Sequence, residues 1–511
     1  MIRLSDPLPE PYDELREVAE SLLAANRRQA VELKVKTFEI EALKFELARL
    51  KRWRFGASAE RFHPDQLGLF EEDLETDLAA VETRQALAEV ALPGKTPRHR
   101  PKRQILPAHL PRIEHRHALE SCACGHCGHE LTVIGEAISE QLDLIPAQFF
   151  VHRHIRPQYA CRHCDTVTAV PMPPQVIDKG LPAPGLLAHI LVSKYADHQP
   201  LYRQAVMYAR QGVFIPRSTQ AGWVGASEVL LEPLVERLRV HLLAETYLQA
   251  DETRLPVLAP GTGKTRTGYL WVYRTGSWSP LQAVVFDYAE GRGQSWPEAF
   301  LAGFKGTLQI DGYAGYNAVL AWQDIVEAAC WAHVRRAFYD VFKATRSPVA
   351  AEALRRIRTL YEIEVELKDL SPEARAVQRQ ARSEPLLKDF RAWLDDTLLK
   401  LPPGSSLAKA IGYALGRWAA LRVYLRDGRI SIDSNPVERA LRGVAVGRRN
   451  YLFAGSAGGG RRAALVYSLI ETCKLNGVDP YAYLKDVLIR LPTQKARDLD
   501  DLLPWRWRPG P

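Results

Sequence analysis

The chain has 511 residues, of which 46% are hydrophobic and 25% charged, and its formal net charge is +8. Single hydrophobic cores stop growing at roughly 250–300 residues, so this length predicts several domains. No run of roughly 18 uncharged apolar residues is present, and the N-terminus lacks an export signal, so we expect no membrane segment and a cytoplasmic location. The basic balance suits phosphate neutralisation in nucleic-acid binding but does not establish it.

The N-terminal region reads as a helix followed by a linker. Residues 13–55 contain neither Gly nor Pro and carry a seam of apolar residues spaced three and four apart: Leu33, Ile40, Leu43, Leu47 and Leu50. This seam favours either a dimerising, leucine-zipper-like helix or a helix that packs on its own protein. Residues 91–104 combine Pro, Gly and basic side chains, which is typical of an extended linker. This linker would either be a basic arm that contacts DNA phosphates or a minor groove, or be a solvated hinge.

Five of the seven cysteines lie between positions 122 and 164. Two Cys-x2-Cys pairs stand out, Cys124 with Cys127 and Cys161 with Cys164, and four thiolates at such spacing are the ligands of a tetrahedral, structural zinc site. Strand residues in the intervening segment would have to bring the two pairs together. The other reading is a set of buried thiols. Further candidates for a ligand position are Cys122, His126, His129 and His163.

A helix-turn-helix is predicted next. Two short helical stretches at 185–196 and 200–210 are followed by a Gln-Gly stop, and a third helix opens after Ile215. Ser218 or Thr219 could cap that helix. Its first residues would then face outward toward DNA, as in a recognition helix: Arg217, Ser218, Thr219 and Gln220. A three-helix unit without a DNA partner is the alternative.

The second half of the chain predicts a mixed α/β sheet and then helices. Strands are expected at 247–250, 269–273, 281–286 and 307–310, with a helix near 295–303. Residues 333–425 read mainly as helices, interrupted at 371–372 and 401–404. The Gly-Thr-Gly-Lys-Thr segment at 261–265 resembles a phosphate-binding loop, but position 258 is Leu where that motif needs Gly. We therefore expect a turn between strands and no ATP site.

Three carboxylates are candidates for metal-dependent chemistry. Asp251 and Asp311 directly follow the first and fourth predicted strands, and if these strands are neighbours the two side chains could bind a divalent ion between them. Each alone could be a turn cap. Glu438 lies in Asp433-Ser-Asn-Pro-Val-Glu438, where Asn435 could be a helix N-cap and Glu438 the partner that completes a capping box.

At this point the sequence resembles the transposases of the bacterial insertion sequence family 66, members of the DDE group with a retroviral-integrase-like, ribonuclease-H-type core. The resemblance covers nearly the whole chain. It rests on the N-terminal seam, the Cys-x2-Cys region and these motifs: Phe55-Gly-Ala-Ser-Ala-Glu60, Ser193-Lys-Tyr-Ala-Asp-His198, Asp251-Glu-Thr253, Asp311-Gly-Tyr-Ala-Gly-Tyr316, Cys330-Trp-Ala-His333 and the block from Asn435 to Ser456.

The resemblance implies a multidomain α+β fold. It would comprise an N-terminal helix or coiled coil, a zinc-binding β module, a helix-turn-helix and a ribonuclease-H-like α/β catalytic core with a helical insertion. The expected boundaries are a leucine-zipper-like helix at 1–60, a basic linker at 61–110, a zinc-binding domain at 111–178, a helix-turn-helix domain at 179–240, the core at 241–345 and 426–475, the insertion at 346–425 and a tail at 476–511.

The same resemblance implies a catalytic triad of Asp251, Asp311 and Glu438 that binds two Mg2+ or Mn2+ ions, cleaves the ends of the element and joins them to target DNA. Phosphate contacts are expected from Arg439, Arg442, Arg448 and Arg449, and an auxiliary role near the site from Cys330 and His333. Expected partners are DNA, a second protomer or more in a synaptic complex, and small accessory proteins of the same element. The rivals are a non-catalytic DNA-binding relic or repressor, and a nuclease that cuts without joining.

Overall fold

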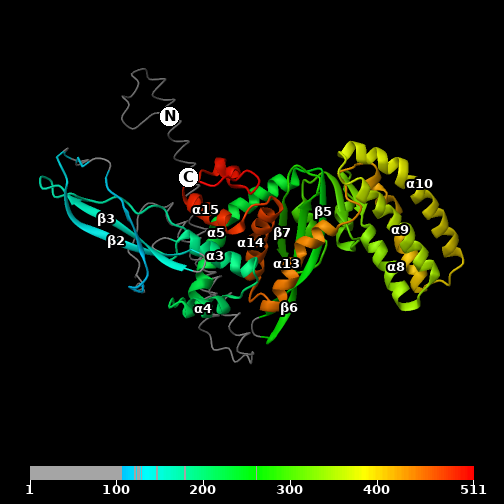
Figure 1. Ribbon diagram of the computed structural model, residues 1–511, viewed down its shortest axis with the longest axis horizontal. Coiled ribbons are helices and arrows are strands. Elements are labelled where there is room, and N and C mark those ends of the chain that lie inside the picture. Colours follow the sequence, from blue (N-terminus) through cyan, green and yellow to red (C-terminus); the bar gives the residue numbers. More distant parts are fainter. Residues whose placement is uncertain are drawn as a thin grey trace, which may run out of the picture.

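The computed structural model describes residues 106–119, 122–123, 127, 129–145, 148–177, 180–259 and 262–510. The predicted zipper helix at 13–55, the linker at 91–104 and two candidate zinc ligands, Cys124 and His126, lie outside these residues. Within them a small sheet forms one end of the molecule, a bundle of helices forms the other, and a five-stranded sheet lies between them (Figure 1).

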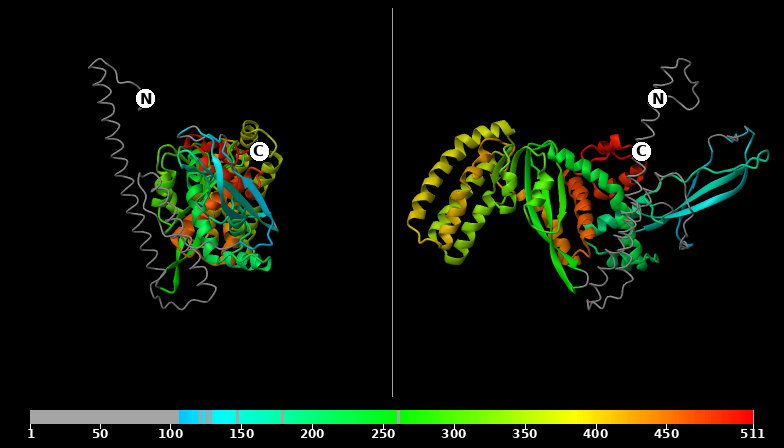
Figure 2. Two further views of the ribbon diagram at one scale, coloured as in Figure 1. Left: turned by 90° about the vertical axis from the view of Figure 1, so that its left-hand side faces the viewer. Right: turned by 180° about the vertical axis from the view of Figure 1, so that it is seen from behind.

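The small sheet is built around a long hairpin. Strands β2 (Thr132–Ile145) and β3 (Gln148–Ala160) pair antiparallel, with Thr132 opposite Ala160. Strand β1 (Arg112–Arg116) adds to β3 in parallel and β4 (Val167–Thr168) adds antiparallel, and the hairpin extends away from the rest of the chain (Figure 2). Because Ala160 lies opposite Thr132, β3 brings Cys161 to the end of the sheet where the chain passes from Cys127 into β2. The prediction that strand residues bring the two cysteine pairs together is confirmed for these residues.

Histidines at alternate positions, His115 in β1 and His117 just after it, and His152 and His154 in β3, form two hydrogen-bonded pairs, because alternate residues of a strand share a face. His115 Nε2 lies 2.8 Å from His152 Nδ1, and His152 Nε2 lies 2.9 Å from Asp143 Oδ2. His117 Nε2 lies 3.1 Å from His154 Nδ1, and the other nitrogen of His154 lies 3.1 Å from the Gln141 side-chain oxygen. Burial, together with the neighbouring histidines and Arg156, lowers the pKa of His154 to about 4.

This histidine pairing predicts a pH-dependent stability. An unfolded histidine titrates near roughly pH 6.5, so between that pH and about 4 the unfolded chain binds more protons than the folded chain at this position. The free energy of unfolding should therefore fall as the pH is lowered through this window. We expect His154→Gln to reduce the slope in thermal unfolding measured from pH 4 to 7, and the exposed His109, changed to Gln, to leave it unchanged. An equal slope in wild type and His154→Gln would contradict this expectation.

Three helices follow, as predicted: α3 (Pro184–Tyr195), α4 (Leu201–Arg210) and α5 (Arg217–Leu243). Two details of the prediction are wrong. Ser218 and Thr219 do not cap α5, because the helix already begins at Arg217, and the N-cap position is Pro216, which provides no side-chain cap. Gln220 does not face outward; it is buried, and its Nε2 donates to the Ile215 carbonyl at 3.1 Å.

The five-stranded sheet has the order β7-β6-β5-β8-β9. Its antiparallel part is β5 (Tyr247–Ala259), β6 (Lys264–Thr275) and β7 (Val284–Ala289). Strands β8 (Gly306–Ile310) and β9 (Ile325–Ala329) continue it in parallel to β5, after α6 (Ser295–Leu301). The four predicted strands and the helix are confirmed, and β9 is an addition. Ala259 pairs with Lys264, and Thr262 and Gly263, the described residues of the segment between them, form a turn, as expected.

One prediction about this sheet is wrong: Asp251 does not follow its strand but lies within it. Strand β5 continues to Ala259 because β6 pairs with it over its whole length, and Asp251 is opposite Val272. A carboxylate inside a strand is held more firmly than one in a loop, because the backbone on both sides is hydrogen-bonded.

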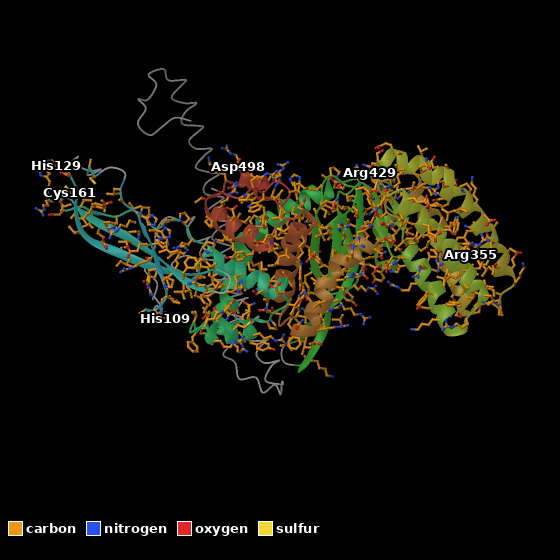
Figure 3. All side chains as sticks on the ribbon, in the orientation of Figure 1. His109, His129, Cys161, Arg355, Arg429 and Asp498 are labelled. Atoms are coloured by element: carbon orange, nitrogen blue, oxygen red, sulfur yellow. The ribbon has the colours of Figure 1, made fainter. Side chains whose placement is uncertain are left out.

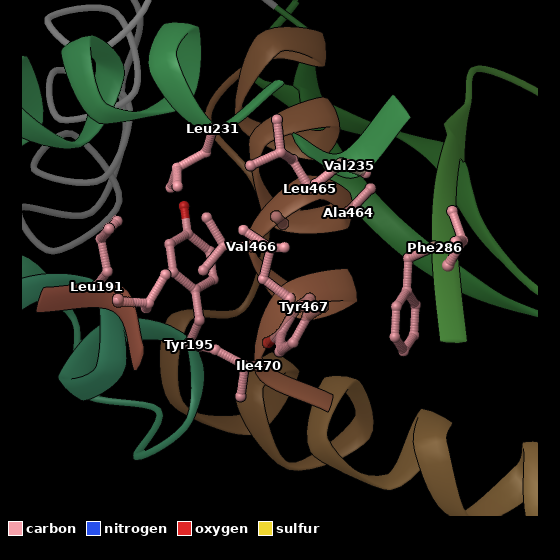
Figure 4. Packing of buried hydrophobic residues seen from close by; sticks show 14 of the residues in the cluster. Leu191, Tyr195, Leu231, Val235, Phe286, Ala464, Leu465, Val466, Tyr467 and Ile470 are labelled. Carbon is pink, nitrogen blue, oxygen red and sulfur yellow. The ribbon is translucent and has the colours of Figure 1, made fainter. Parts of the chain in front are cut away.

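Helices cover both faces of the sheet. On one face, α13 (Asn435–Tyr451) and α14 (Ala457–Leu475) pack, and Phe286 of β7 contacts Tyr467 of α14. The same core continues to Tyr195 of α3 and to Leu231 and Val235 of α5 (Figure 4). On the other face, the ring of Tyr273 stacks on Phe300 of α6, with 3.8 Å between centroids. The sheet is therefore buried on both sides, which keeps its strands in a fixed register.

The bundle is the helical stretch that the sequence predicts, and it has its own hydrophobic core around Trp331, Phe390 and Trp418. Its interruptions fall where expected; Ser371 accepts the Ala374 N–H as the N-cap of one helix. The bundle comprises α8 (Trp331–Thr345), α9 (Pro348–Glu366), α10 (Pro372–Leu399), α11 (Ser406–Gly416), α12 (Trp418–Leu421) and η2 (Val423–Leu425).

Short helices complete the described chain: η1 (Ala314–Tyr316), α7 (Asn317–Leu320), α15 (Pro480–Arg490), η3 (Leu491–Thr493) and η4 (Ala496–Leu502). In the part of the chain that the structure describes, no helix is long and apolar enough to cross a bilayer.

Candidate functional site

The central feature is an acidic site beside β5 and β8, two paired inner strands of the five-stranded sheet. These strands are parallel, and Gln249 is paired with Gln309. Asp251 lies two residues further along β5, and Asp311 lies two residues after Gln309, directly after β8 ends at Ile310. The two carboxylates are close enough that Asp311 helps to raise the pKa of Asp251. The expectation that the first and fourth strands are neighbours is therefore confirmed.

Negative charge accumulates around Asp251. Burial, with further contributions from the carboxylates of Glu252, Asp311 and Glu438, raises the pKa of Asp251 to about 8. Its Oδ1 accepts the Glu252 N–H at 2.8 Å. Glu252 itself pairs with Arg292, which lies over the ring of Tyr313 at 3.6 Å from the centroid. A partly buried group of carboxylates that repel one another in this way is suited to a hard divalent cation, which prefers oxygen ligands.

Glu438 reaches this group from the first turn of α13. Its Oε1 lies 3.8 Å from His333 Nε2 and its Oε2 lies 3.6 Å from Arg336 Nη2. The capping-box alternative is wrong in its geometry: the N-cap position is Ser434, not Asn435, and it makes no side-chain cap hydrogen bond. Asn435 instead donates its backbone N–H to Asp433 Oδ1 at 3.1 Å. Glu438 therefore does not complete a cap as the sequence suggested.

Asp311 is held by the turn that follows it and by the helical bundle. Its Oδ1 accepts the Tyr313 N–H at 2.8 Å, and its carbonyl accepts the Tyr413 hydroxyl of α11 at 2.6 Å. Gly312 has a φ of 99°, a conformation that favours glycine, and a Cβ there would collide with the guanidinium of Arg417. The turn after β8 thus requires glycine for two reasons.

The Cys330-x2-His333 element lies beside the same site. Cys330 is buried, and its Sγ accepts the Ser434 N–H at 3.2 Å, so it contacts the segment that leads into α13. Burial, with Arg336 and Arg417 nearby, lowers the pKa of His333, while Asp311 and Glu438 act in the opposite direction. The pair therefore lies beside Glu438 and the segment that leads into α13.

A second candidate metal centre lies at the far end of the small sheet, where Figure 3 labels Cys161 and His129. Cys127 Sγ lies 3.5 Å from both Cys161 Sγ and Cys164 Sγ, and the three thiols form a group tight enough to hold an ion. A hydrogen bond from Thr166 is the main cause that lowers the pKa of Cys164 to about 6, which favours the thiolate that binds metal. These thiols fit three positions of a structural zinc site, and Cys124 is the expected fourth.

The other candidates near the thiols are not part of this group. Cys122 is exposed, and the rings of His129 and His163 stack on each other with 4.1 Å between centroids. Among the described residues, the thiols are the one set of three or more candidate ligands drawn together so closely; the three carboxylates are electrostatically coupled but do not form an equally tight set.

The arginines that were predicted to contact DNA differ in their exposure to solvent. Arg439, Arg442 and Arg449 are exposed on α13, the helix that carries Glu438. Arg448 is partly buried, and its guanidinium donates to the Arg254 carbonyl of β5. At the start of α5, Ser218 is exposed, whereas Arg217 and Thr219 are half-buried.

Several residues around the acidic site were not predicted from the sequence. Tyr413 and Arg417 come from the helical bundle, roughly a hundred positions beyond Asp311, and no local pattern marks them. Gln249 and Gln309 did carry a signal, because each is a polar residue in an otherwise buried strand, two positions before an aspartate.

Known protein families match most of the chain. Residues 179–462 match the family described as Transposase IS66 family, and residues 468–505 match its C-terminal element. Residues 121–165 match the zinc-finger binding domain of transposase IS66, and residues 42–114 match the family described as Transposase C of IS166 homeodomain.

Relatives from Sinorhizobium fredii (strain NBRC 101917 / NGR234) are similar over most of their length. The uncharacterized protein y4jD is 39% identical over 483 residues, which cover 91% of this chain and 94% of the relative. The uncharacterized protein y4qI is 39% identical over 479 residues, which cover 90% and 88%. With a family match over more than half of its residues, the chain belongs to the IS66 family of transposases.

Proposed function

We propose that this chain is a DDE transposase that cleaves the ends of its element and joins them to target DNA, with Asp251, Asp311 and Glu438 as the catalytic triad. The observation that carries the proposal is the parallel pairing of β5 with β8, in which Gln249 is opposite Gln309, two residues before Asp251 and Asp311, together with the packing of α13, which bears Glu438, on β5. The sheet order, three antiparallel strands followed by two parallel ones, supports the ribonuclease-H-like core that the resemblance implies.

The triad would hold two divalent ions, Mg2+ or Mn2+, through its carboxylate oxygens. When bound, such ions activate a water molecule and stabilise the leaving oxygen of a phosphodiester. In the first step water attacks the phosphorus at the element end, the P–O3′ bond breaks and a 3′-hydroxyl is released. In the second, that hydroxyl attacks a phosphodiester of the target, which releases a new 3′-hydroxyl there. No side chain forms a covalent bond with DNA.

DNA contacts are proposed on two elements. The exposed arginines of α13 lie on the helix of Glu438, where they would contact phosphates close to the reacting bond. Helices α4 and α5 would form the helix-turn-helix that recognises the terminal inverted repeats, with Ser218 and the half-buried Arg217 and Thr219 at the start of α5. The zinc module and the linker would extend this contact. Dimerisation through the N-terminal helix and help from accessory proteins remain part of the proposal.

The experiment that tests the proposal is strand cleavage and joining on a duplex that carries the flanking element end, with Mg2+, in wild type and Glu438→Gln. We expect the variant to bind DNA but to lose cleavage by roughly three orders of magnitude, because a metal-ligand charge is removed. Glu471→Gln on α14 is the matched control, since its carboxylate is also partly buried but pairs with Lys474 outside the triad. Equal cleavage by wild type and Glu438→Gln would refute the triad.

The products distinguish the remaining possibilities. Cleavage without joined product, in the presence of target DNA, would identify a nuclease. DNA binding by wild type without cleavage under any divalent metal would identify a DNA-binding relic. A product in which the element's 3′ end is joined to a target 5′ phosphate, with a free 3′-hydroxyl left on the target, identifies a transposase.

A further inference from the structure

A buried polar cluster connects the three chain segments that carry the proposed triad. It consists of Tyr247, Gln249 and Gln309, and is called the glutamine cluster below. Gln249 and Gln309 are 0% exposed and Tyr247 is 4% exposed. Because side chains alternate along a strand, Gln249 lies on the same face of β5 as Asp251, and Gln309 precedes Asp311 by two residues at the end of β8. The cluster is therefore directly adjacent to the acidic site.

Hydrogen bonds connect the two strands through these side chains. The Tyr247 hydroxyl donates to Gln309 Oε1 at 2.6 Å. Gln249 Nε2 lies 2.7 Å from the same oxygen and 3.0 Å from the Tyr247 hydroxyl. These bonds are made in addition to the backbone ladder, so β5 and β8 are joined twice at the position that precedes Asp251 and Asp311.

The same amides also bind the backbone that leads into α13. Gln249 Nε2 donates to the Asp433 carbonyl at 3.1 Å, and Gln309 Nε2 donates to the Ser431 carbonyl at 2.9 Å. The Ser431 N–H donates in turn to the Tyr247 hydroxyl at 3.1 Å. These backbone groups lie five and seven residues before Glu438, so the glutamine cluster attaches the third triad segment to the other two.

The helical bundle holds that segment from the other side. The Tyr361 hydroxyl of α9 donates to Asp433 Oδ2 at 2.9 Å, and Asn435 Nδ2 donates to the same oxygen at 2.6 Å. The chain before α13 is thus fixed between the sheet and the bundle. Buried amides stabilise a core less than apolar side chains of the same volume would, so their value here is the geometry they impose.

We propose that Gln249 and Gln309 are positioning residues that set the distance between the aspartates of the sheet and Glu438, and thereby the affinity of the triad for divalent metal. This inference rests on the proposed function. Residues that orient metal ligands without touching the metal typically change metal affinity or activity by roughly 10–100-fold when they are mutated. The glutamine cluster acts on all three ligands through their backbone, so its effect should lie in this range.

The test uses the full zinc-loaded chain with Gln249→Met and Gln309→Met, which keep the side-chain length but remove the amide donors. We expect Mn2+ to bind roughly 10–100-fold more weakly, measured from the electron paramagnetic resonance of unbound Mn2+. The Mg2+ concentration for half-maximal cleavage should rise by the same factor, while kcat at saturating Mg2+ changes less. A merely structural loss would lower kcat and leave the metal midpoint unchanged.

The matched control is Gln204→Met in α4. Gln204 is 1% exposed and its Nε2 also donates to backbone carbonyls, those of Gln199 and Ile190, but it lies away from the triad. Its thermal unfolding should shift like that of the test variants, and its Mn2+ affinity should stay at the wild-type value. If a methionine variant fails to fold, Tyr247→Phe takes its place, with a smaller expected loss of about threefold in Mn2+ affinity.

The outcomes separate this inference from the function on which it rests. The positioning role is overturned if the glutamine variants fold and bind Mn2+ with wild-type affinity, or if Tyr247→Phe has an unchanged Mn2+ affinity. In that case, loss of Mn2+ binding in Asp311→Asn would still support the proposed triad. If Asp311→Asn itself binds Mn2+ as wild type does, the proposed triad fails first. Weakened binding in both glutamine variants, with Gln204→Met unchanged, supports the inference.

Discussion

Asp311→Asn is expected to abolish metal-dependent cleavage while the chain still folds and binds DNA. The substitution keeps the shape of the side chain and the hydrogen bond that its Oδ1 accepts from the Tyr313 N–H, but it removes one charge from the metal-binding group. Charge stabilisation by a bound metal contributes several kcal/mol, so loss of one ligand should reduce the cleavage rate by roughly 1,000-fold. The measurement is single-turnover cleavage of an end duplex at saturating Mg2+.

The control for this prediction is Asp287→Asn. Asp287 is a carboxylate of the same sheet, on β7, and burial raises its pKa to about 6, but the charged groups near it are Arg239 and Glu236 rather than the triad. Its removal should leave cleavage within about twofold of wild type. Cleavage by Asp311→Asn at the wild-type rate, or equal losses in both variants, would count against a specific metal-binding role.

Cys161→Ser is expected to remove zinc from the chain and to unfold the small sheet around its cysteines. Cys161 is 1% exposed and its Sγ lies 3.5 Å from Cys127 Sγ, so serine would leave a buried hydroxyl in place of a thiolate ligand. Structural zinc sites contribute on the order of 10 kcal/mol to the folding of small metal-dependent modules. We expect zinc content to fall from about one ion per chain to near zero, and end-DNA binding to weaken at least about tenfold.

Cys122→Ser provides the comparison, because Cys122 belongs to the same module but is exposed and outside the thiol group. It should retain its zinc, measured by atomic absorption on the purified chain. Cleavage of end DNA that is already bound should survive in Cys161→Ser, since the acidic site lies on a different sheet. Zinc loss in Cys122→Ser with retention in Cys161→Ser would require a different set of ligands.

Features of this protein that depend on neighbouring residues could be predicted from the sequence, and features that depend on distant residues could not. Helix and strand positions could be predicted because hydrophobic period and Pro or Gly breaks are local properties, and the expected helices α3, α4 and α5 are found at their predicted residues. The two Cys pairs could be recognised because ligand spacing is also local. The proposed triad residues were chosen through the resemblance to a family, which rests on short motifs.

What could not be predicted depends on packing between distant segments. The continuation of β5 past Asp251 is decided by its partner β6, and the burial of Gln220 by the helices around it. The N-cap of α13 is Ser434 rather than Asn435. The Asn435 N–H donates to the side chain of Asp433, which also accepts the hydroxyl of Tyr361 from the helical bundle. None of these contacts leaves a pattern in neighbouring residues.

The family, the candidate metal ligands and the secondary structure therefore follow from the order of amino acids, since short-range chemistry specifies them. The parallel register that sets Asp251 beside Asp311, and the glutamine cluster that ties both to the segment before Glu438, arise only when β5, β8 and α13 pack together. These contacts join residues 60 to 184 positions apart. Their geometry is set by the burial of both faces of the sheet, which no single segment encodes.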